Sequence, residues 1–109
     1  MDPIIVTLSG EYDIDRKGQL RDQLEEIYVH PYVVIDLTGV GYVDSTCLCE
    51  FMRLRQARKA AGLHSACFVV DDRRFGRLFR FLGFDEVFKV VHSLEEAFSP
   101  ERLTQVSSA

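Results

Sequence analysis

The chain has 109 residues, of which 47% are hydrophobic, and this size fits one small domain with a buried core. Thirteen Lys and Arg against 17 Asp and Glu give a net charge of −4, which argues against nucleic acid as the main partner. No apolar run approaches the roughly 18 residues that a membrane span needs, and the start of the chain does not resemble a signal peptide. The odd number of cysteines, without a secretory signal, indicates free thiols and a cytoplasmic location.

The first third of the chain predicts two short strands and one helix. Ile4–Leu8 is a β-branched run, and after a Ser-Gly break Glu11–Ile14 is short and could pair with it. Asp15 is a candidate N-cap for an amphipathic helix that runs from Arg16 to about Val29. The His-Pro pair that follows ends this helix, because a residue before proline disfavours helical backbone.

The centre of the chain predicts a buried strand, a loop and a long helix. Val33–Leu37 is apolar at four of its five positions without alternation, as expected for a strand covered on both faces. Thr38–Tyr42 contains two glycines and is predicted to be a loop. The helix is expected from about Thr46 to Ala61, with Gly62 at the position of a C-terminal cap.

The last third predicts two more strands and two more helices. Ala66–Val70 is predicted to be a strand buried on both faces. Either of the two aspartates after it could cap a helix that ends at a glycine. The inward side of that helix is expected to carry Phe75, Leu78, Phe79 and Leu82. Val87–Val91 is a short strand, and Ser93 with a glutamate three residues later forms a capping box for the final helix.

This alternation predicts an α/β fold with a four- or five-stranded mixed sheet packed against about four helices. The whole chain, residues 1–109, is expected to form a single domain with its core at about 4–98, and residues 104–109 are expected to be frayed. Two groups of basic residues are interpreted as solvated helix faces. They are Arg53, Arg55, Arg58 and Lys59, and then Arg73, Arg74, Arg77 and Arg80.

Metal binding and catalysis find little support in the sequence. Cys47 and Cys49 are two apart on a helix and point about 200° from each other, so they cannot share one ion with His64 and Cys67. There is no nucleophile elbow, phosphate-binding loop or dinucleotide fingerprint. We therefore expect no metal, no cofactor and no enzymatic activity.

The sequence Asp44-Ser45-Thr46 stands where the central strand unit meets the long helix. Asp, Ser and Thr are the favoured residues at a helix N-cap, so a purely structural role explains this triplet, and Asp44 is expected to cap the long helix. A phosphate on one of the hydroxyls would also be stabilised there by the helix dipole and by free backbone N–H groups. It would add about −1.5 to −2 charges to one spot on the surface, next to Asp44.

From Ile4 to about Phe98 the chain resembles the STAS family of anti-sigma factor antagonists. The resemblance rests on LSGEYDIDRKGQLRDQL, VVIDLTGVGYVDST, AAGLHSACFVV and RRFGRLFRFLGFDEVFKVVHSLEEAF taken together. It implies a bacterial, cytoplasmic domain that regulates transcription by partner switching. Such proteins bind an anti-sigma factor that is also a serine kinase of the GHKL type. Phosphorylation blocks the binding and a PP2C-like phosphatase restores it.

The same resemblance implies which residues would act. The family motif D-S-S-G-L-G or D-S-T-G-L-G falls on residues 44–49, so Ser45 takes the place of the phospho-acceptor and Thr46 is the second choice. Asp13 matches an aspartate that lies near the acceptor in the family. The expected partner-binding residues are Asp13, Thr38, Gly39, Val40, Gly41, Tyr42, Asp44, Thr46, Cys47, Cys49 and Glu50.

Three positions depart from the family pattern. Cys47 and Cys49 replace both glycines of the motif, and their side chains add bulk where a partner backbone would approach. Because they lie on different faces of a helix, at least one is expected to be partly exposed. Glu50 stands where the family usually has an aliphatic residue, either as part of the partner face or as an ordinary acid favoured by the helix dipole.

Two further hypotheses stay open on the sequence alone. The chain could be a STAS subunit that is never phosphorylated, either a scaffold or a cytosolic part of a transporter, and the missing glycines favour this reading. Alternatively, Cys47 could be a redox-sensitive thiol activated at the start of a helix.

Overall fold

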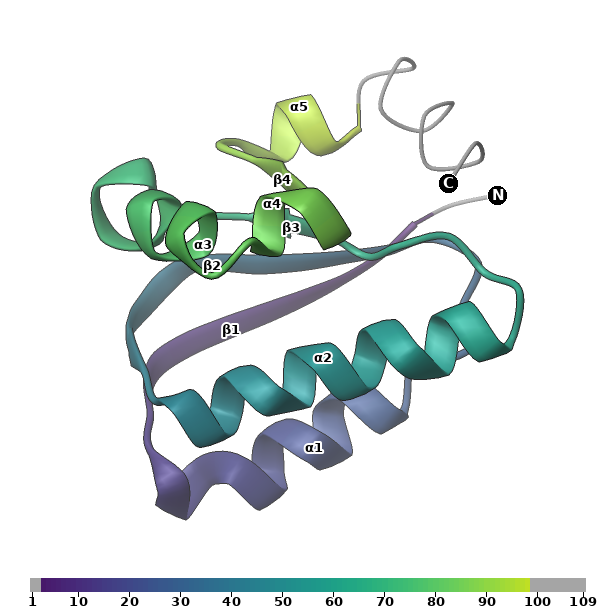
Figure 1. Cartoon of the computed structure of the whole chain (residues 1–109), viewed down its shortest axis with the longest axis horizontal. Coiled ribbons are helices and arrows are strands. Elements are labelled where there is room, and N and C mark those ends of the chain that lie inside the picture. Colours follow the sequence, from purple (N-terminus) through teal and green to yellow (C-terminus); the bar gives the residue numbers. More distant parts are fainter. Residues whose placement is uncertain (1–2, 99–109) are drawn as a thin grey trace.

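The computed structural model describes residues 3–98, and within them four strands form one sheet in the order β1-β2-β3-β4 (Figure 1). The strands are β1 (Ile4–Tyr12), β2 (Val33–Val43), β3 (Cys67–Val69) and β4 (Lys89–Val91). The four-stranded α/β fold is confirmed. All three strand pairs within residues 3–98 are parallel, so the antiparallel pairing of a mixed sheet is not observed there.

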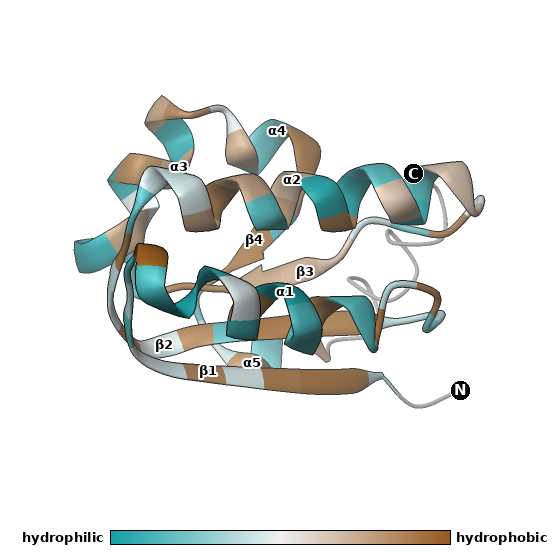
Figure 2. Ribbon diagram, turned by 90° about the horizontal axis from the view of Figure 1, so that it is seen from below, coloured by the Kyte–Doolittle hydropathy of each residue, from teal (hydrophilic) through white to brown (hydrophobic). Residues whose placement is uncertain are grey.

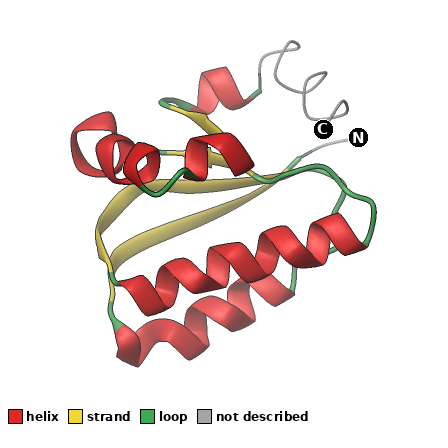
Figure 3. Ribbon diagram, in the orientation of Figure 1, coloured by secondary structure: helices red, strands yellow, loops and turns green. Residues whose placement is uncertain are grey.

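Helices connect and follow the strands (Figure 3). They are the 3₁₀-helix η1 (Ile14–Arg16), α1 (Lys17–Glu25), α2 (Ser45–Ala60), the π-helical turn η2 (Asp72–Gly76), α3 (Arg77–Phe81), α4 (Phe84–Val87) and α5 (Leu94–Ala97). No helix within residues 3–98 combines the length and the apolar character needed to cross a membrane. The expectation for residues 104–109 falls outside the described residues.

The sheet is covered on both faces, because successive residues of a strand point to opposite sides. Ile35 and Phe68 belong to the main core with residues of α1–α4, whereas Val34, Cys67 and Val69 pack with α5 on the other face. Figure 2 shows α1 and α2 lying side by side over the strands, with α5 behind the sheet. The expected burial of the central strands on both faces is therefore confirmed.

The first strand is longer than predicted. Ile4–Tyr12 is one strand along the edge of the sheet, and Glu11–Ile14 does not form a second strand that pairs back onto it. Two register shifts against β2, one near Ser9 and one after Gly10, let β1 continue through the predicted break. Gly10 supplies the positive φ, of 82°, that a residue with a side chain rarely adopts.

The predicted loop Thr38–Tyr42 is wrong, because these residues form the second half of β2. The glycines that indicated a loop serve the pairing with β1 instead. Gly39 pairs with Ser9 of β1, and a Cβ on Gly39 would lie in van der Waals contact with the carbonyl oxygen of Leu8 at 3.4 Å. The strand is thus carried out to Val43, next to the start of α2.

The caps of the first two helices differ in how well the sequence predicted them. Asp13 rather than Asp15 caps the first helical segment, since its carboxylate accepts a hydrogen bond from the Asp15 N–H at 3.0 Å. The regular helix α1 is also shorter than the predicted segment. The long helix α2 matches its prediction within one residue at each end, and Gly62 ends it with a φ of 73°.

The region between β3 and β4 is more broken than predicted. Asp71 caps a π-helical turn and not a regular helix, and Gly83, with a φ of 75°, separates α3 from the short helix α4. Leu82, expected to point inward, is 42% exposed. The cap at Ser93 is confirmed, because its hydroxyl accepts a hydrogen bond from the Glu96 N–H at 3.1 Å.

Arg58 corrects the prediction of a fully solvated basic face on α2. Its side chain is 1% exposed, and its guanidinium donates to four carbonyl oxygens. Burial lowers the pKa of Arg58. The bonds run from Nε to His64 (2.7 Å), from Nη1 to Tyr28 (3.2 Å) and His30 (2.6 Å), and from Nη2 to Pro31 (3.0 Å).

Candidate functional site

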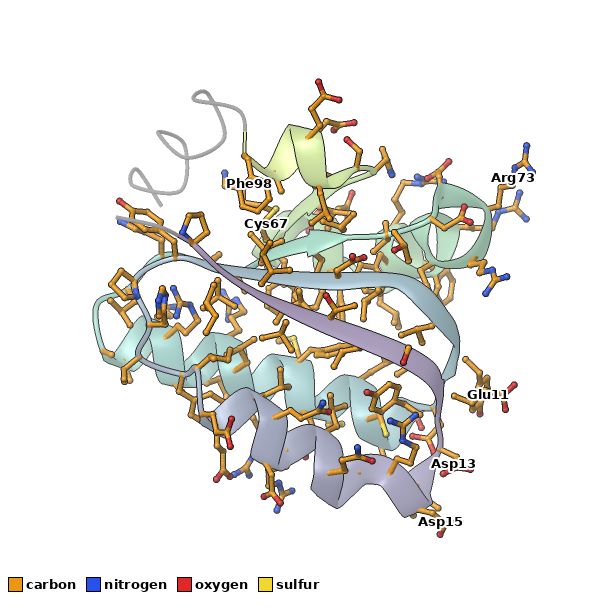
Figure 4. All side chains as sticks on the ribbon, turned by 180° about the vertical axis from the view of Figure 1, so that it is seen from behind. Glu11, Asp13, Asp15, Cys67, Arg73 and Phe98 are labelled. Carbon is orange, nitrogen blue, oxygen red and sulfur yellow. The ribbon has the colours of Figure 1, made fainter. Side chains whose placement is uncertain are left out.

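The candidate site lies where β1 and β2 end and α2 begins. The backbone N–H of Asp44 donates to the carbonyl oxygen of Tyr12 at 3.0 Å, which holds the start of α2 against the end of β1. The carboxyl ends of parallel strands meet at one edge of a sheet. In Figure 4, Glu11, Asp13 and Asp15 gather at this end of the molecule.

Asp44 is the N-cap of α2, as predicted. Its Oδ1 accepts a hydrogen bond from the backbone N–H of Cys47 at 2.9 Å and another from the Thr46 hydroxyl at 2.7 Å. The hydrogen bond from Thr46, and after it the one from Cys47, lowers the pKa of Asp44 below its ordinary value. The cap is therefore a carboxylate at neutral pH, with a fixed position at the positive end of the helix dipole.

The two hydroxyls after Asp44 differ in their surroundings. Thr46 is half-buried, and its hydroxyl is committed to the Asp44 carboxylate. Ser45 is exposed, and no hydrogen bond engages its hydroxyl within the described part of the chain. Of the two candidate acceptors, Ser45 is thus the one whose oxygen is open to an incoming reagent.

The two cysteines of the site also face different environments. Cys47 is fully buried, its thiol donates to the carbonyl oxygen of Asp13 at 3.3 Å, and burial together with the charge of Asp44 raises its pKa to about 11. A buried thiol with a raised pKa is a poor nucleophile, which contradicts the hypothesis of a redox-sensitive Cys47. Cys49 is exposed, so the expectation that at least one of the pair reaches the surface is confirmed.

Glu50 is not available to a partner, contrary to its place among the expected partner-binding residues. Its side chain is 1% exposed and makes two 2.9 Å hydrogen bonds to Arg21 of α1, with Arg53 at 3.5 Å. The hydrogen bonds from Arg21 hold the pKa of Glu50 below its ordinary value despite the burial. Glu50 therefore joins α1 to α2, and a bidentate pair of this kind fixes both positions.

The other expected partner residues divide by exposure. The side chains of Val40 and Cys47 are buried and cannot touch a partner directly, although both hold the shape of the site. Tyr42 is 50% exposed, which is high for an aromatic residue at the end of a central strand. The exposed members of the expected set are Asp13, Thr38, Gly39, Gly41, Tyr42 and Cys49, with Asp44 and Thr46 half-buried.

A metal site was not expected, and no group of His, Cys, Asp and Glu within residues 3–98 could hold an ion. His64 stacks on Tyr32 with the ring centroids 6.2 Å apart. None of the three cysteines, all of which the structure describes, forms a disulfide. The chemistry that the site offers is a free serine hydroxyl beside a capping carboxylate.

Comparison with known proteins places this geometry in a family. A family model described as Mlab, STAS domain matches residues 2–92. The chain belongs to the STAS-domain family. An anti-sigma-B factor antagonist of Listeria monocytogenes is 31% identical to this STAS domain over 91 residues, which cover 82% of this chain and 79% of the relative. The same values hold for an anti-sigma-B factor antagonist of Listeria innocua.

Solved structures share the fold of this STAS domain. A Thermotoga maritima protein described as a candidate anti-sigma factor antagonist superposes with a TM-score of 0.76 at 16% identity, over 95% of this chain and 86% of its own. The anti-sigma factor antagonist SpoIIAA in its unphosphorylated form gives 0.67 at 14% identity, over 98% of this chain and 91% of its own. These likenesses show that the architecture is that of STAS-domain structures.

Two arginines near the site of this STAS domain were missed by the sequence reasoning. Arg16 lies over the Tyr12 ring at 3.9 Å and donates to the carbonyl oxygens of Ser9 and Glu11 at 3.0 and 3.2 Å, which fixes the end of β1. Arg74 of η2 donates from Nη1 to the carbonyl oxygen of Val40 at 3.3 Å. The contact of Arg74 joins segments 34 residues apart, so no local pattern could indicate it, whereas Arg16 contacts residues only four to seven positions earlier in the chain.

Proposed function

We propose that this STAS domain is a cytoplasmic anti-sigma factor antagonist that acts by binding and not by catalysis. Its partner is an anti-sigma factor with GHKL-type serine kinase activity, and binding releases a sigma factor for transcription. The 31% identity to two anti-sigma-B factor antagonists supports this proposal at the level of the family. The observation that carries the proposed switch is the exposed Ser45 hydroxyl at the start of α2, beside the capping Asp44.

The proposed switch follows from charge. A phosphate on Ser45 would be stabilised within the domain by the N-terminus of α2, so the fold would tolerate it. It would also add about −1.5 to −2 charges beside Asp44 and near Asp13, which are already acidic. A partner surface that fits the unmodified site would then meet a strong local repulsion. A PP2C-like phosphatase would remove the phosphate and restore binding.

The proposed docking surface consists of the exposed residues around Ser45. Asp13 comes from the β1–η1 turn, Gly41 and Tyr42 come from the end of β2, and Cys49 comes from the first turns of α2. Cys47, although it replaces a family glycine, is buried and leaves the surface unchanged in bulk. Of the two cysteines that replace family glycines, only Cys49 therefore places a side chain that the partner must accommodate.

The test uses purified anti-sigma factor kinases encoded in the same genome and isothermal titration calorimetry. We expect Ser45→Asp to weaken binding at least about tenfold, because a charge at a docking surface is disfavoured against a matched partner. Ser45→Ala should bind as the wild type does and should accept no phosphate. Gln56→Glu, which adds a negative charge at an exposed position farther along α2, should bind within about twofold of the wild type. Equal binding by Ser45→Asp and wild type would show that the proposed switch is wrong.

A STAS scaffold or transporter-associated subunit that is never phosphorylated is the second candidate. Cys49 favours it, because an exposed side chain stands where the family motif has a glycine and could obstruct a kinase. Incubation with the same kinases and ATP, followed by mass spectrometry of the peptide that contains Ser45, separates the two. Phosphate at Ser45 or Thr46 removes the second candidate.

A further inference from the structure

A second surface feature lies beside the proposed docking surface, on η2 and α3. An open hollow of about 660 Å³ is lined by four arginines, one aspartate and two apolar residues, and we call it the arginine groove: Asp72, Arg73, Arg74, Arg77, Leu78, Arg80 and Phe81. The sequence indicated these arginines only as a solvated helix face. The structure places them around this hollow, with Arg73 and Arg74 on the π-helical turn η2 and Arg77 and Arg80 on α3.

The arginine groove carries a surplus of positive charge in an acidic protein. Arg80 pairs with Asp72 at 3.0 Å, and both side chains are 56% exposed. Arg74 donates to a backbone carbonyl, which does not neutralise its charge. The side chains of Arg73 and Arg77 are exposed, and neither contacts a carboxylate within residues 3–98. Three guanidinium groups thus remain without a counter-ion there, although the net charge of the chain is −4.

The groove also has an apolar side. Phe81, at the end of α3, is 86% exposed, and its neighbour Leu82 is 42% exposed. The aromatic core of the domain lies close by without them, since Phe79 packs edge-on against Phe68 and Phe84 at 5.8 and 5.1 Å. An exposed aromatic side chain beside unpaired arginines is the composition that protein interfaces favour over ordinary surface.

The groove is continuous with the docking surface around Ser45. The hydrogen bond from Arg74 to Val40 ties η2 to the end of β2, and Gly41 and Tyr42 follow Val40 directly. In Figure 4, Arg73 lies at the same end of the molecule as Glu11, Asp13 and Asp15. One partner that covers Tyr42 would therefore reach both the acidic residues of the β1–η1 turn and the arginine groove.

We propose that the arginine groove binds an acidic segment of a protein partner, which carries an apolar side chain that covers Phe81. The proposal rests on the proposed function insofar as it assigns this segment to the same anti-sigma factor. Guanidinium groups bind carboxylates with two parallel hydrogen bonds, so several arginines around a hollow suit a run of Asp and Glu. An anionic membrane fits less well, because the three acidic residues at the same end would be repelled by it and the surface is concave.

The first experiment tests the chemistry of the groove with a defined probe. Isotope-labelled protein is titrated with the peptide acetyl-Glu-Glu-Leu-Asp-Glu-Leu-Glu-amide, and backbone amide signals are followed by NMR. Signals of residues 72–82 should shift, and Arg77→Glu should abolish the shifts. Lys59→Glu, the same charge reversal at an exposed position of α2, should leave them in place. Absence of shifts in residues 72–82, or equal shifts with the Gln and Asn version of the peptide, would overturn the proposal.

The second experiment uses the anti-sigma factor itself. Arg73→Glu and Arg77→Glu should each weaken its binding at least about tenfold, with Arg77→Lys within about threefold of the wild type, since these arginines are exposed and charge reversal there acts on the partner. Unchanged affinity of both reversals would overturn the assignment of the segment to this partner. If the wild type binds no anti-sigma factor, the proposed function fails, and the peptide titration still decides on the groove. A third measurement is sedimentation with vesicles of phosphatidylcholine and phosphatidylglycerol. If the wild type sediments with them and Arg77→Glu does not, the groove binds a membrane surface and the proposal of an acidic protein segment is overturned.

Discussion

The two ends of α2 use polar groups in opposite ways. At its start, Asp44 and Ser45 stand at the surface, and the Ser45 hydroxyl has no partner within residues 3–98. Near its other end, Arg58 is almost fully buried, and four carbonyl oxygens surround its guanidinium. The first end is open to other molecules, and the second end is closed by the protein's own backbone.

The difference shows that residue type does not decide the role of a polar group. Arg58 stands among Arg55 and Lys59 in the sequence and looks like one more member of a basic helix face. Its role is set by the chain segment after α1, whose carbonyl oxygens lie within its reach. Glu50, between the two ends, resembles Arg58, because its side chain is also buried and is paired with a residue distant in the chain, Arg21 of α1.

The sharpest way to break this comparison is Arg58→Ala. The substitution removes a buried guanidinium and leaves four carbonyl groups without this donor, and we expect a loss of about 3–5 kcal/mol in the free energy of unfolding. A loss of that size approaches the whole stability of a small domain. Urea denaturation measures it, with Arg55→Ala as the control, which should change stability by less than about 0.5 kcal/mol. A cost below about 1 kcal/mol for Arg58→Ala would mean that the cage of carbonyls contributes little.

Glu50→Gln should have the next largest effect. It keeps the shape of the side chain and removes the charge that pairs with Arg21, and we expect a loss of about 1–2 kcal/mol at neutral pH because Arg21 can regain water. The folded-state pKa of Glu50 is lowered, so its contribution is present above the unfolded value of about 4.3 and disappears as the pH falls through the folded value. Denaturation curves of Glu50→Gln and wild type should therefore differ at pH 7 and converge in acid. A difference that persists unchanged in acid would point to packing and not to charge.

Asp44→Ala should have the smallest effect on stability of the three. It removes a cap that accepts two hydrogen bonds at an accessible helix end, where water can replace part of what is lost. We expect the thermal midpoint to fall by only a few degrees. Thermal unfolding followed by circular dichroism measures this, with Asp15→Ala as a control that leaves the caps in place. If the thermal midpoint falls as far for Asp44→Ala as for Arg58→Ala in the same measurement, the two ends of α2 do not differ as described.

The parts of the fold that the sequence predicted well are those decided by neighbouring residues. The cap at Asp44, the extent of α2 and the glycine at its end all follow from local chemistry, and each was confirmed. The carboxylate of Glu50 and the guanidinium of Arg58 could not be placed in this way, because Arg21 and three of the four carbonyl oxygens around Arg58 lie 27–30 residues away in the chain. A charged residue at an inward helix position was the available signal, and it was outweighed by the expectation that charges are solvated.

The prediction for the end of β2 was wrong for a related reason. Glycines in Thr38–Tyr42 indicated a loop, yet Gly39 is paired with Ser9 of β1 and lies in close contact with Leu8. Glycine in a sequence does not distinguish a loop from a strand, since it permits a turn and also permits close contact between strands. The candidate site could be predicted from the sequence only in part, for the same reason. Ser45 and Asp44 could be named from the sequence, whereas the position of Arg74 against Val40 required the fold.

The parallel order of the strands has a consequence for how the domain is made. β1 cannot fold back on a hairpin partner, because Ile4 pairs with Val33, and α1 must be synthesised in between. The apolar residues of β1 therefore have no partner strand until β2 has been synthesised. The same holds for β3 and β4, since Cys67 pairs with Lys89. Pairings of this kind are non-local and slow to form. During synthesis β1, which later forms one edge of the sheet, exposes its apolar residues before its partner strand exists, so it needs protection from aggregation.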